Sequence, residues 1–237
     1  MSPQPRRAII RDAISVGVAV GAYGLSFGAL GTTSGLTVLQ TQVLSLLLFS
    51  GASQFAVVSI VGAGGNPASA WASSALLGMR NGLYALRLSP LLAVRGWRRP
   101  IAAHLTIDES TAMALANDDE SDPTHRGART GFWATGLSVF GFWNAATLIG
   151  AVAGSHISDP RVFGLDAAIP AGFAALVAPR LTTSLTRGLA LVCGVVAASV
   201  SPWTRPGVPV LIAALIALAA AVRFGEPVPP ATAQATP

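Results

Sequence analysis

The sequence contains few charged residues and no lysine. Only 11% of its 237 residues are charged, whereas a typical soluble domain carries about 25%. Hydrophobic residues make up 52% of the chain, its mean hydropathy is +0.60, and apolar runs long enough to cross a hydrocarbon core of ~30 Å recur throughout. These proportions exclude an ordinary soluble globule. They predict a multi-pass protein of the cell membrane, with the lipid bilayer as the solvent for most side chains.

Signatures of metal, redox and enzyme chemistry are also missing. The single cysteine, Cys193, excludes an internal disulfide, and His104, His125 and His156 lack metal-ligand spacing. The stretch GAGGN (62–66) lacks the lysine of a phosphate-binding loop, and no nucleophile or paired-acid motif is present. We therefore expect no metal, no cofactor and no enzymatic activity. All 15 positive charges are arginine, and most lie between apolar runs, which is typical of topology signals rather than of a nucleic-acid surface.

The apolar runs and the polar stretches between them divide the chain into two membrane halves. Arginines precede the first apolar run and border the polar stretch in the middle of the sequence. Because cytoplasmic loops are rich in Arg, we place both segments in the cytoplasm. The predicted segments are a cytoplasmic tail (1–12), a first transmembrane half (13–95), a polar connector (96–129), a second transmembrane half (130–223) and a proline-rich, disordered tail (224–237).

The first apolar run, 13–31, is too long for a secretory signal and lacks a small-residue cleavage site. We interpret it as a retained transmembrane helix. Its glycines follow one another at spacings of four, three, four and three, so a helix keeps them on one face, where a second helix can approach closely. The glycines predicted to pack in this way are Gly17, Gly21, Gly24, Gly28 and Gly31.

Residues 36–95 are almost continuously apolar, but three polar or glycine-rich stretches interrupt them: SGASQ (50–54), GAGGNP (62–67) and MRNG (79–82). Sixty residues are too many for one or two straight helices, so we expect three or four short or discontinuous ones. The predicted fold class is therefore all-α, a polytopic membrane bundle that contains short or discontinuous helices.

Two pairs of segments indicate an internal repeat. GALG at Gly28 resembles GAVAG at Gly150, and SGASQFAVV resembles IPAGFAALV, with Phe55 matching Phe173. Many transporters are built from such repeats, and their substrate sites lie where the repeats meet. The alternative is chance similarity between membrane segments rich in alanine and glycine. The number of crossings in the first half decides whether a repeat is parallel or inverted.

The interruption at 50–54 has two interpretations. In lipid, irregular backbone is tolerated only where protein or a wet cavity surrounds it. If the helix breaks, a new helix that starts near Ser53 presents unpaired N–H groups and a positive dipole end, which together bind a carboxylate. If the helix is unbroken, its small residues pack against a neighbour and Gln54 forms a hydrogen bond across the interface.

Charged residues within the apolar runs are functional candidates, because a charge near the bilayer centre costs at least ~2.5 kcal/mol. Arg80 and Arg87 are seven residues apart, so they share one helix face with Tyr84. A guanidinium on that face can bind a substrate carboxylate through two hydrogen bonds. The alternative is that the arginine side chain extends to the membrane surface, and this alternative is favoured for Arg87. Asp166 is either a functional carboxylate within the membrane or the cap of a helix near the membrane surface.

The polar connector contains a stretch with a helical pattern, RPIAAHLTIDESTAMALAND. In one helix, His104, Asp108 and Thr111 share a face, while Glu109 points elsewhere. A carboxylate beside an imidazole exchanges protons near neutral pH. The alternative is a solvated helix in a cytoplasmic loop.

Several of these motifs, in order, resemble the AzlC family of branched-chain amino acid permeases. The resemblance runs from about residue 10 to residue 181 and is carried by GAYGLSFGALG, FSGASQFAVVSIVGAGG, LLGMRNGLYALRLSPLL, LTIDESTAMALAND and FGLDAAIPAGFAALVAP. It implies a transporter, in characterised relatives an exporter of leucine, isoleucine and valine and sometimes of methionine. It also implies an ion gradient as the driving force and a small AzlD-type membrane subunit as partner.

The chain departs from the family pattern around its conserved arginine segment, which Arg80 matches. The family's asparagine before the arginine is Gly78 or Met79 here, and its histidine after the arginine is Asn81. If that histidine serves proton coupling, this chain must use another group, such as Asp108 or His104.

The resulting hypothesis is a secondary transporter that exports hydrophobic amino acids. Import, transport of another small solute, and a non-transporting membrane subunit that assembles with a partner are the alternatives. The residues expected to bind substrate are Ser53, Gln54, Phe55, Arg80, Asn81 and Tyr84, and those expected to couple or gate transport are His104, Asp108, Glu109 and Asp166.

Overall fold

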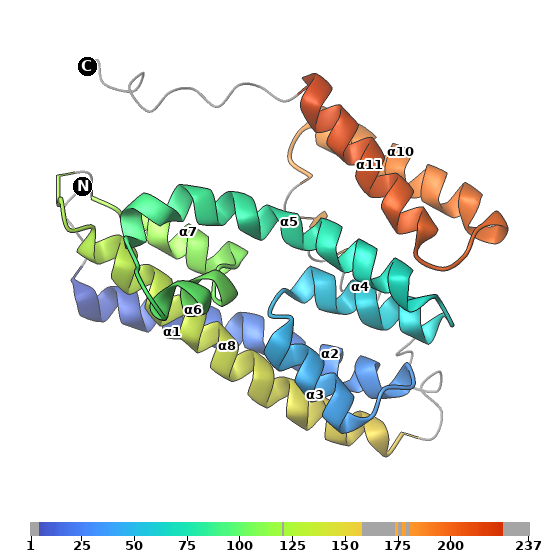
Figure 1. Cartoon of the computed structure of the whole chain (residues 1–237), viewed down its shortest axis with the longest axis horizontal. Helices are drawn as coiled ribbons and strands as arrows, with labels where there is room; N and C mark the ends of the chain where they lie inside the picture. Colours follow the sequence, from blue (N-terminus) through green and yellow to red (C-terminus); the bar gives the residue numbers. More distant parts are fainter. Residues whose placement is uncertain (1–4, 120, 158–173, 175–176, 179–180, 225–237) are drawn as a thin grey trace.

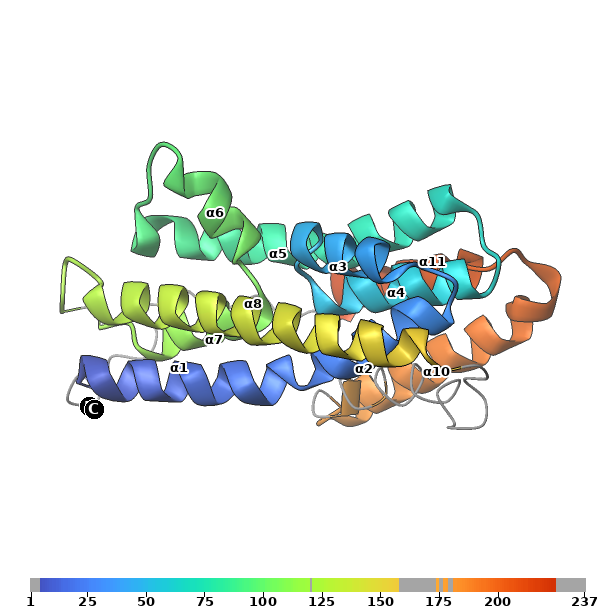
Figure 2. The same cartoon turned by 90° about the horizontal axis from the view of Figure 1, so that it is seen from below.

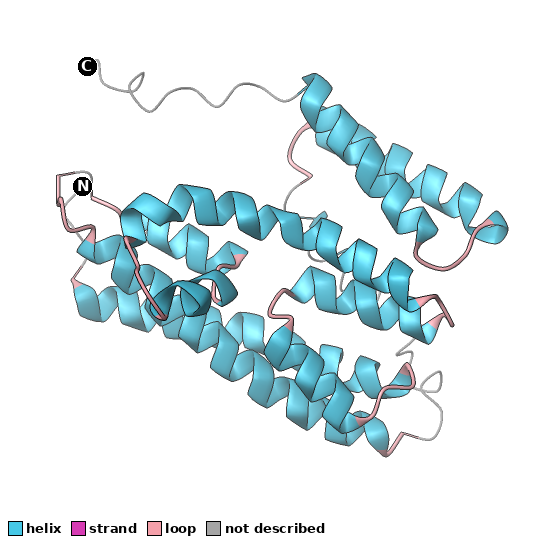
Figure 3. Cartoon of the chain, viewed as in Figure 1, coloured by secondary structure: helices cyan, strands magenta, loops and turns pink. Residues whose placement is uncertain are grey.

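The computed structural model describes residues 5–119, 121–157, 174, 177–178 and 181–224. These residues form helices joined by loops, and none of them belongs to a strand (Figure 1, Figure 3). The predicted all-α fold is thus confirmed for this part of the chain. The helices are α1 (Arg6–Gly21), α2 (Tyr23–Thr33), α3 (Val38–Leu47), α4 (Gly51–Gly62), α5 (Pro67–Leu92), α6 (Arg98–His104), α7 (Asp108–Ala116), α8 (Arg126–Ser155), α10 (Ser184–Val200), the short 3-10 helix η3 (Ser201–Trp203) and α11 (Val208–Phe224).

Within the described residues, three helical stretches are long and apolar enough to cross a membrane: Arg6–Thr33, Arg126–Ser155 and Ser184–Trp203. The first comprises α1 and α2, because Ala22 between them keeps helical backbone angles. Helix α5, with 26 residues and a length of about 39 Å at 1.5 Å per residue, is of similar length but is not one of these three apolar stretches. The predicted multi-pass membrane localisation is confirmed.

The long helices α1, α2 and α8 lie side by side and run in the same direction (Figure 1, Figure 2). Gly17 lies against Ser138, and a Cβ atom at Gly28 would overlap the backbone of Thr147. The two backbones therefore approach more closely than a side chain at these positions would allow. The glycines that face α8 are Gly17, Gly21, Gly24 and Gly28, whereas Gly31 faces Thr41 of α3.

Two short helical hairpins enter the bundle from opposite ends (Figure 1). Helix α3 runs inward from the end where α2 stops, and after a break at 48–50 helix α4 returns to that end. From the other end, helix α6 runs inward, and after a break at 105–107 helix α7 returns. The two tips meet, because the ring centroids of Phe49 and His104 are 5.8 Å apart. Both breaks are thus surrounded by protein, where irregular backbone is tolerated.

Local hydrogen bonds explain where the hairpin helices begin. Thr37 and Gln40 form a reciprocal capping box at the start of α3. At the second tip, the Ser110 hydroxyl accepts a hydrogen bond from the Ile107 N–H at 3.1 Å and donates one to the Leu105 carbonyl oxygen at 2.7 Å. This hydroxyl replaces the backbone hydrogen bonds that the break removes.

Three helices, α3, α4 and α5, occupy the region 36–95. Their number agrees with the three or four helices predicted there, and α3 and α4 are short as expected, but α5 is a continuous helix of 26 residues. The interruption at 62–67 is a true break. Helix α4 ends at Gly62, and Asn66 caps α5 by accepting a hydrogen bond from the Ala68 N–H at 2.7 Å. Pro67 suits the first position of α5, because its missing N–H would have no partner there.

Of the two interpretations of 50–54, the structure shows the broken helix: α4 begins at Gly51, close to the expected start near Ser53, because the extended Ser50 (φ −157°) precedes it. The structure corrects the sequence-based interpretation at two other places. Helix α5 continues through MRNG, since a glycine inside a helix costs only about 1 kcal/mol. The connector does not form one helix: α6 ends at His104 and α7 begins at Asp108, so these two side chains do not share a helical face.

The arginine-rich segments gather at one end of the bundle, where α1 begins, α5 ends and α8 begins (Figure 1). There the Arg129 Nε donates a hydrogen bond of 3.0 Å to the Leu91 carbonyl oxygen and ties α8 to α5. In the adjoining loop, His125 Nδ1 lies 2.7 Å from Asp118 Oδ1. This contact ties the segment after α7 to the start of α8.

Helices α10 and α11 pack against each other, and α11 also contacts α5. None of their residues is buried, as expected for apolar helices that face lipid. Asp166, Phe173 and the tail residues 225–237 lie outside the described residues, so the second half of the repeat, the carboxylate within it and the disordered tail stay predictions.

Candidate functional site

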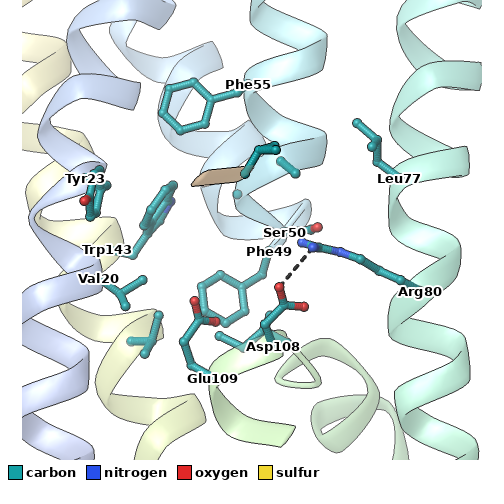
Figure 4. Close-up of a pocket in the computed structure, with 15 residues that line it drawn as sticks. Val20, Tyr23, Phe49, Ser50, Phe55, Leu77, Arg80, Asp108, Glu109 and Trp143 are labelled. Atoms are coloured by element: carbon teal, nitrogen blue, oxygen red, sulfur yellow. Dashed lines mark hydrogen bonds and ion pairs between the residues drawn. The ribbon is translucent and has the colours of Figure 1, made fainter. Parts of the chain in front are cut away.

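A cavity of about 330 Å³ lies where the two hairpin tips meet the long helices (Figure 4). This volume is at the lower end of the ~300–1,000 Å³ of small-molecule pockets. The wall combines the start of a helix, charged side chains and apolar surface. The residues that line it include Val20, Tyr23, Phe49, Ser50, Gly51, Ala52, Phe55, Leu77, Arg80, Ile107, Asp108, Glu109, Val139 and Trp143.

The start of α4 contributes backbone N–H groups to the cavity wall. The first hydrogen bond of this helix joins the Gln54 N–H to the Ser50 carbonyl oxygen at 2.9 Å, and the N–H groups before it have no acceptor within the helix. Gly51 and Ala52, which carry two of them, line the cavity. Ser50 is 6% exposed, and its hydroxyl has no hydrogen-bond partner among the described residues. This side of the cavity therefore offers donors and a positive dipole end.

An ion pair between α5 and α7 crosses the cavity (Figure 4). Arg80 Nη1 lies 2.9 Å from Asp108 Oδ2, and the two side chains are 34% and 22% exposed. Partial burial strengthens this attraction compared with a surface pair, because less water screens it. The Arg80 Nε is buried and has no acceptor in the described part of the chain, so the guanidinium retains a donor. Glu109 follows Asp108 in α7 and also lines the cavity.

Aromatic side chains form the apolar wall. The rings of Phe27 and Phe55 meet edge to face with centroids 5.6 Å apart, and the Phe55 and Trp143 rings meet edge to face at 6.4 Å. Phe27 and Trp143 stack at 6.1 Å, so the three rings support one another. The indole N–H of Trp143 is buried and lacks an acceptor among the described residues. The wall thus accepts a hydrocarbon group and retains one polar donor.

Four of the predicted site residues line this cavity, namely Phe55, Arg80, Asp108 and Glu109. Ser53 and Gln54 lie in α4 but join helices instead: the Ser53 hydroxyl donates to the Ser74 carbonyl oxygen at 3.0 Å, and the Gln54 amide donates to the Ser45 carbonyl oxygen at 3.3 Å. In the described part of the structure, Asn81, Tyr84 and His104 do not line the cavity.

Sequence reasoning did not assign Ser50, Gly51, Ala52 or Trp143 to the site. Ser50 followed by Gly51 was a usable signal, because serine is a preferred residue immediately before a helix. Trp143 carried no such signal, since its place in the cavity depends on the register between α8 and the hairpin of α3 and α4. That register depends on packing between segments far apart in the sequence.

Comparison with known proteins gives the family of this chain. The family model described as "AzlC protein" matches residues 15–157. The chain belongs to the AzlC family. The family match confirms the resemblance seen in the sequence and includes the whole of both hairpins, together with α8. The match supports a role related to membrane transport.

Two relatives from different strains of Helicobacter pylori are similar to this AzlC-family chain. Both are described as "Uncharacterized membrane protein". One is 25% identical over 135 residues, with 57% of this chain and 58% of the relative covered; the other is 27% identical over 146 residues, with 61% and 62% covered. The chain therefore spans about three fifths of the length of these relatives. No solved structure matches the chain.

Proposed function

We propose that this AzlC-family protein is a secondary transporter that exports leucine, isoleucine, valine and other hydrophobic amino acids such as methionine. The observation that carries the proposal is a cavity of about 330 Å³ with a positive side, an acidic side and an apolar wall. A free hydrophobic amino acid has the three complementary parts: a carboxylate, an ammonium group and a hydrocarbon chain. Export and an ion gradient as driving force follow the family resemblance.

In this proposal the substrate carboxylate binds at the start of α4. The N–H groups of Gly51 and Ala52, the Ser50 hydroxyl and the Arg80 guanidinium are the donors. Their combination resembles the broken-helix sites in which transporters bind anionic groups. Ser53 and Gln54 do not contact the substrate in this proposal. They position α4, because their side chains form hydrogen bonds to neighbouring helices.

The substrate ammonium binds on the acidic side, at Asp108 and Glu109. Asp108 accepts a hydrogen bond from Arg80 in the structure, so a zwitterion exchanges one ion pair for two: its carboxylate pairs with Arg80 and its ammonium with Asp108. This exchange preserves the charge balance inside the bundle, which keeps the desolvation cost of binding low.

The hydrocarbon chain of the substrate packs against Phe55, Val139 and Trp143. Full burial of a Leu, Ile, Val or Met side chain stabilises binding by about 1.5–3 kcal/mol. A polar side chain would gain no such stabilisation and would lose its hydration. The apolar wall therefore selects hydrophobic amino acids over polar ones.

The orientation follows from the arginine-rich end, which holds the start of α1 and the segment between α5 and α8 (Figure 1). By the positive-inside rule this end faces the cytoplasm. A small AzlD-type membrane subunit is the partner that the family resemblance implies. The hairpin of α6 and α7 then opens toward the cytoplasm, and the hairpin of α3 and α4 toward the other side.

The test is amino acid release from cells that lack their own branched-chain exporters. The chain is expressed with and without the AzlD-type subunit, the cells are loaded with leucine- or methionine-containing dipeptides, and release is timed. We expect faster release, which Arg80→Ala abolishes. The control is Arg87→Ala, two turns further along α5 and exposed, which should release normally. Unchanged release with and without the subunit would reject these substrates.

A second candidate, a non-transporting membrane subunit, is favoured by one observation. Ser53 and Gln54 bond to neighbouring helices rather than to the cavity. This candidate predicts that Arg80→Ala changes the amount of assembled complex and leaves amino acid release at the background rate in every variant. Copurification of the AzlD-type subunit, measured beside release, distinguishes the two.

A further inference from the structure

A buried polar cluster lies between α3, α4 and α8, and none of its members lines the cavity. The Ser45 hydroxyl donates to the Thr147 Oγ1 at 3.3 Å, and the Gln54 Nε2 donates to the Ser45 carbonyl oxygen at 3.3 Å. One turn earlier on α3 and α8, the Gln42 Nε2 lies 3.4 Å from both the O and Oδ1 atoms of Asn144. Ser45, Gln54 and Thr147 are each 0% exposed.

Two acceptors of the cluster lack a donor among the described residues. The side-chain oxygens Oε1 of Gln42 and Gln54 are buried and have no hydrogen-bond partner in the described part of the chain. A buried polar atom of this kind is costly unless a partner satisfies it. Ser45 also lies in the last turn of α3, where carbonyl groups lack helical donors and the dipole end is negative. Each of these features favours a positive partner.

The chemistry of the cluster restricts which cation fits. Its oxygens belong to amides, hydroxyls and a backbone carbonyl, none of which takes up a proton near neutral pH. Ca²⁺ and Mg²⁺ sites draw on carboxylates, and the cluster contains none. A hard monovalent cation suits neutral oxygen ligands. In transporters with discontinuous helices, the C-terminal ends of half-helices and unwound carbonyls bind such ions.

We propose that this cluster binds a sodium ion, with the side-chain oxygens of Ser45, Gln54 and Thr147 as ligands and those of Gln42 and Asn144 completing the site. Gln54 belongs to α4, whose first residues form the anion-binding side of the cavity. Sodium that holds Gln54 against α3 and α8 therefore fixes the donors that face the substrate. The effect of sodium on substrate binding rests on the proposed amino acid transport, whereas sodium binding itself does not.

The test uses the purified full chain in lipid nanodiscs, without amino acid. Sodium chloride is titrated against choline chloride at constant total chloride, and the melting temperature is measured. We expect it to rise with sodium and to saturate, because a ligand that binds only the folded state stabilises it. Potassium over the same range should give a smaller rise. Equal melting temperatures in sodium and choline would overturn the proposal and indicate buried water in place of an ion.

Substitutions of threonines in α8 test where the ion binds. Thr147→Val keeps the side-chain shape but removes the hydroxyl, and it should raise the sodium concentration for half-maximal stabilisation about tenfold, equivalent to ~1.4 kcal/mol. Thr147→Ser should restore the response. The control, Thr135→Val, alters another threonine of α8 that is also 0% exposed and lies outside the cluster; its response should be unchanged. Identical responses of Thr147→Val and Thr135→Val would reject this location, and Ser45→Ala repeats the test if Thr147→Val does not fold.

Leucine binding measured in sodium and in choline separates the two proposals. Tighter leucine binding in sodium, lost in Thr147→Val, supports both. Sodium-dependent stabilisation without leucine binding supports the ion site and rejects the amino acid site. Leucine binding that is the same in sodium and in choline, together with equal melting temperatures, rejects the ion site alone.

Discussion

Arg80 and Asp108 are 28 positions apart in the sequence, yet their side chains meet at 2.9 Å inside the cavity. The pair does two things at once. It neutralises two charges that would be costly within the bundle, and it joins α5 to the hairpin of α6 and α7. A substrate that replaces the pair therefore also loosens a contact between two elements.

At the residue scale, we expect Arg80→Gln to lower the free energy of unfolding by about 1 kcal/mol, because the variant loses a charge-assisted hydrogen bond that is only partly buried. The Asp108 carboxylate would lose the guanidinium that balances its charge. Thermal unfolding of the purified protein in nanodiscs measures the change. Substrate binding should be lost in the same variant, since Arg80 is a proposed carboxylate donor.

The double variant Arg80→Gln/Asp108→Asn controls for the structural part of this effect. It removes both charges together, so its stability should return toward that of the unmodified chain. Leucine binding should stay absent. Restored binding in the double variant would show that the pair serves stability alone.

At the scale of elements, the parallel contact of α1 and α2 with α8 depends on glycine. We expect Gly28→Val to destabilise the fold by about 1–3 kcal/mol, the usual cost of overpacking, because its Cβ would overlap the Thr147 backbone. The melting temperature reports the loss. The matched control is Gly141→Ala on α8, where a Cβ meets no atom within 4 Å; it should be neutral or stabilising by up to about 1 kcal/mol, because alanine favours helix. Equal loss in both variants would contradict the close contact.

Some of the helix breaks were predictable from the sequence, whereas the cavity was not. The break before α4 was predictable, because serine and glycine interrupt an apolar run that needs protein around any irregular backbone. The break at 105–107 also had a signal, since Asp108 and Glu109 are typical of a helix's first turn, but the amphipathic pattern across it favoured one helix. The cavity was not predictable, because it depends on two hairpins meeting tip to tip. Sequence periodicity specifies which face of a helix is apolar, but not which distant helix covers it.

At the scale of the whole molecule, the orientation is open to a labelling test. In a Cys193→Ala background, Ala63→Cys marks the loop between α4 and α5, and Pro123→Cys marks the loop between α7 and α8; both positions are exposed. If the arginine-rich end faces the cytoplasm, a membrane-impermeant maleimide should label Ala63→Cys in intact cells and Pro123→Cys only after permeabilisation. The reverse pattern would invert the orientation and the direction assigned to each hairpin.

The two hairpin tips meet between the ends of the long helices (Figure 1), and this position has an electrical consequence. An elementary charge that crosses the whole membrane exchanges about 2.3 kcal/mol with a potential of 100 mV. A zwitterion has no net charge, so it reaches the tips from either side without electrical work. A sodium ion bound between α3, α4 and α8 carries its charge through part of the voltage drop. Leucine binding is then indifferent to membrane voltage, whereas sodium binding is not.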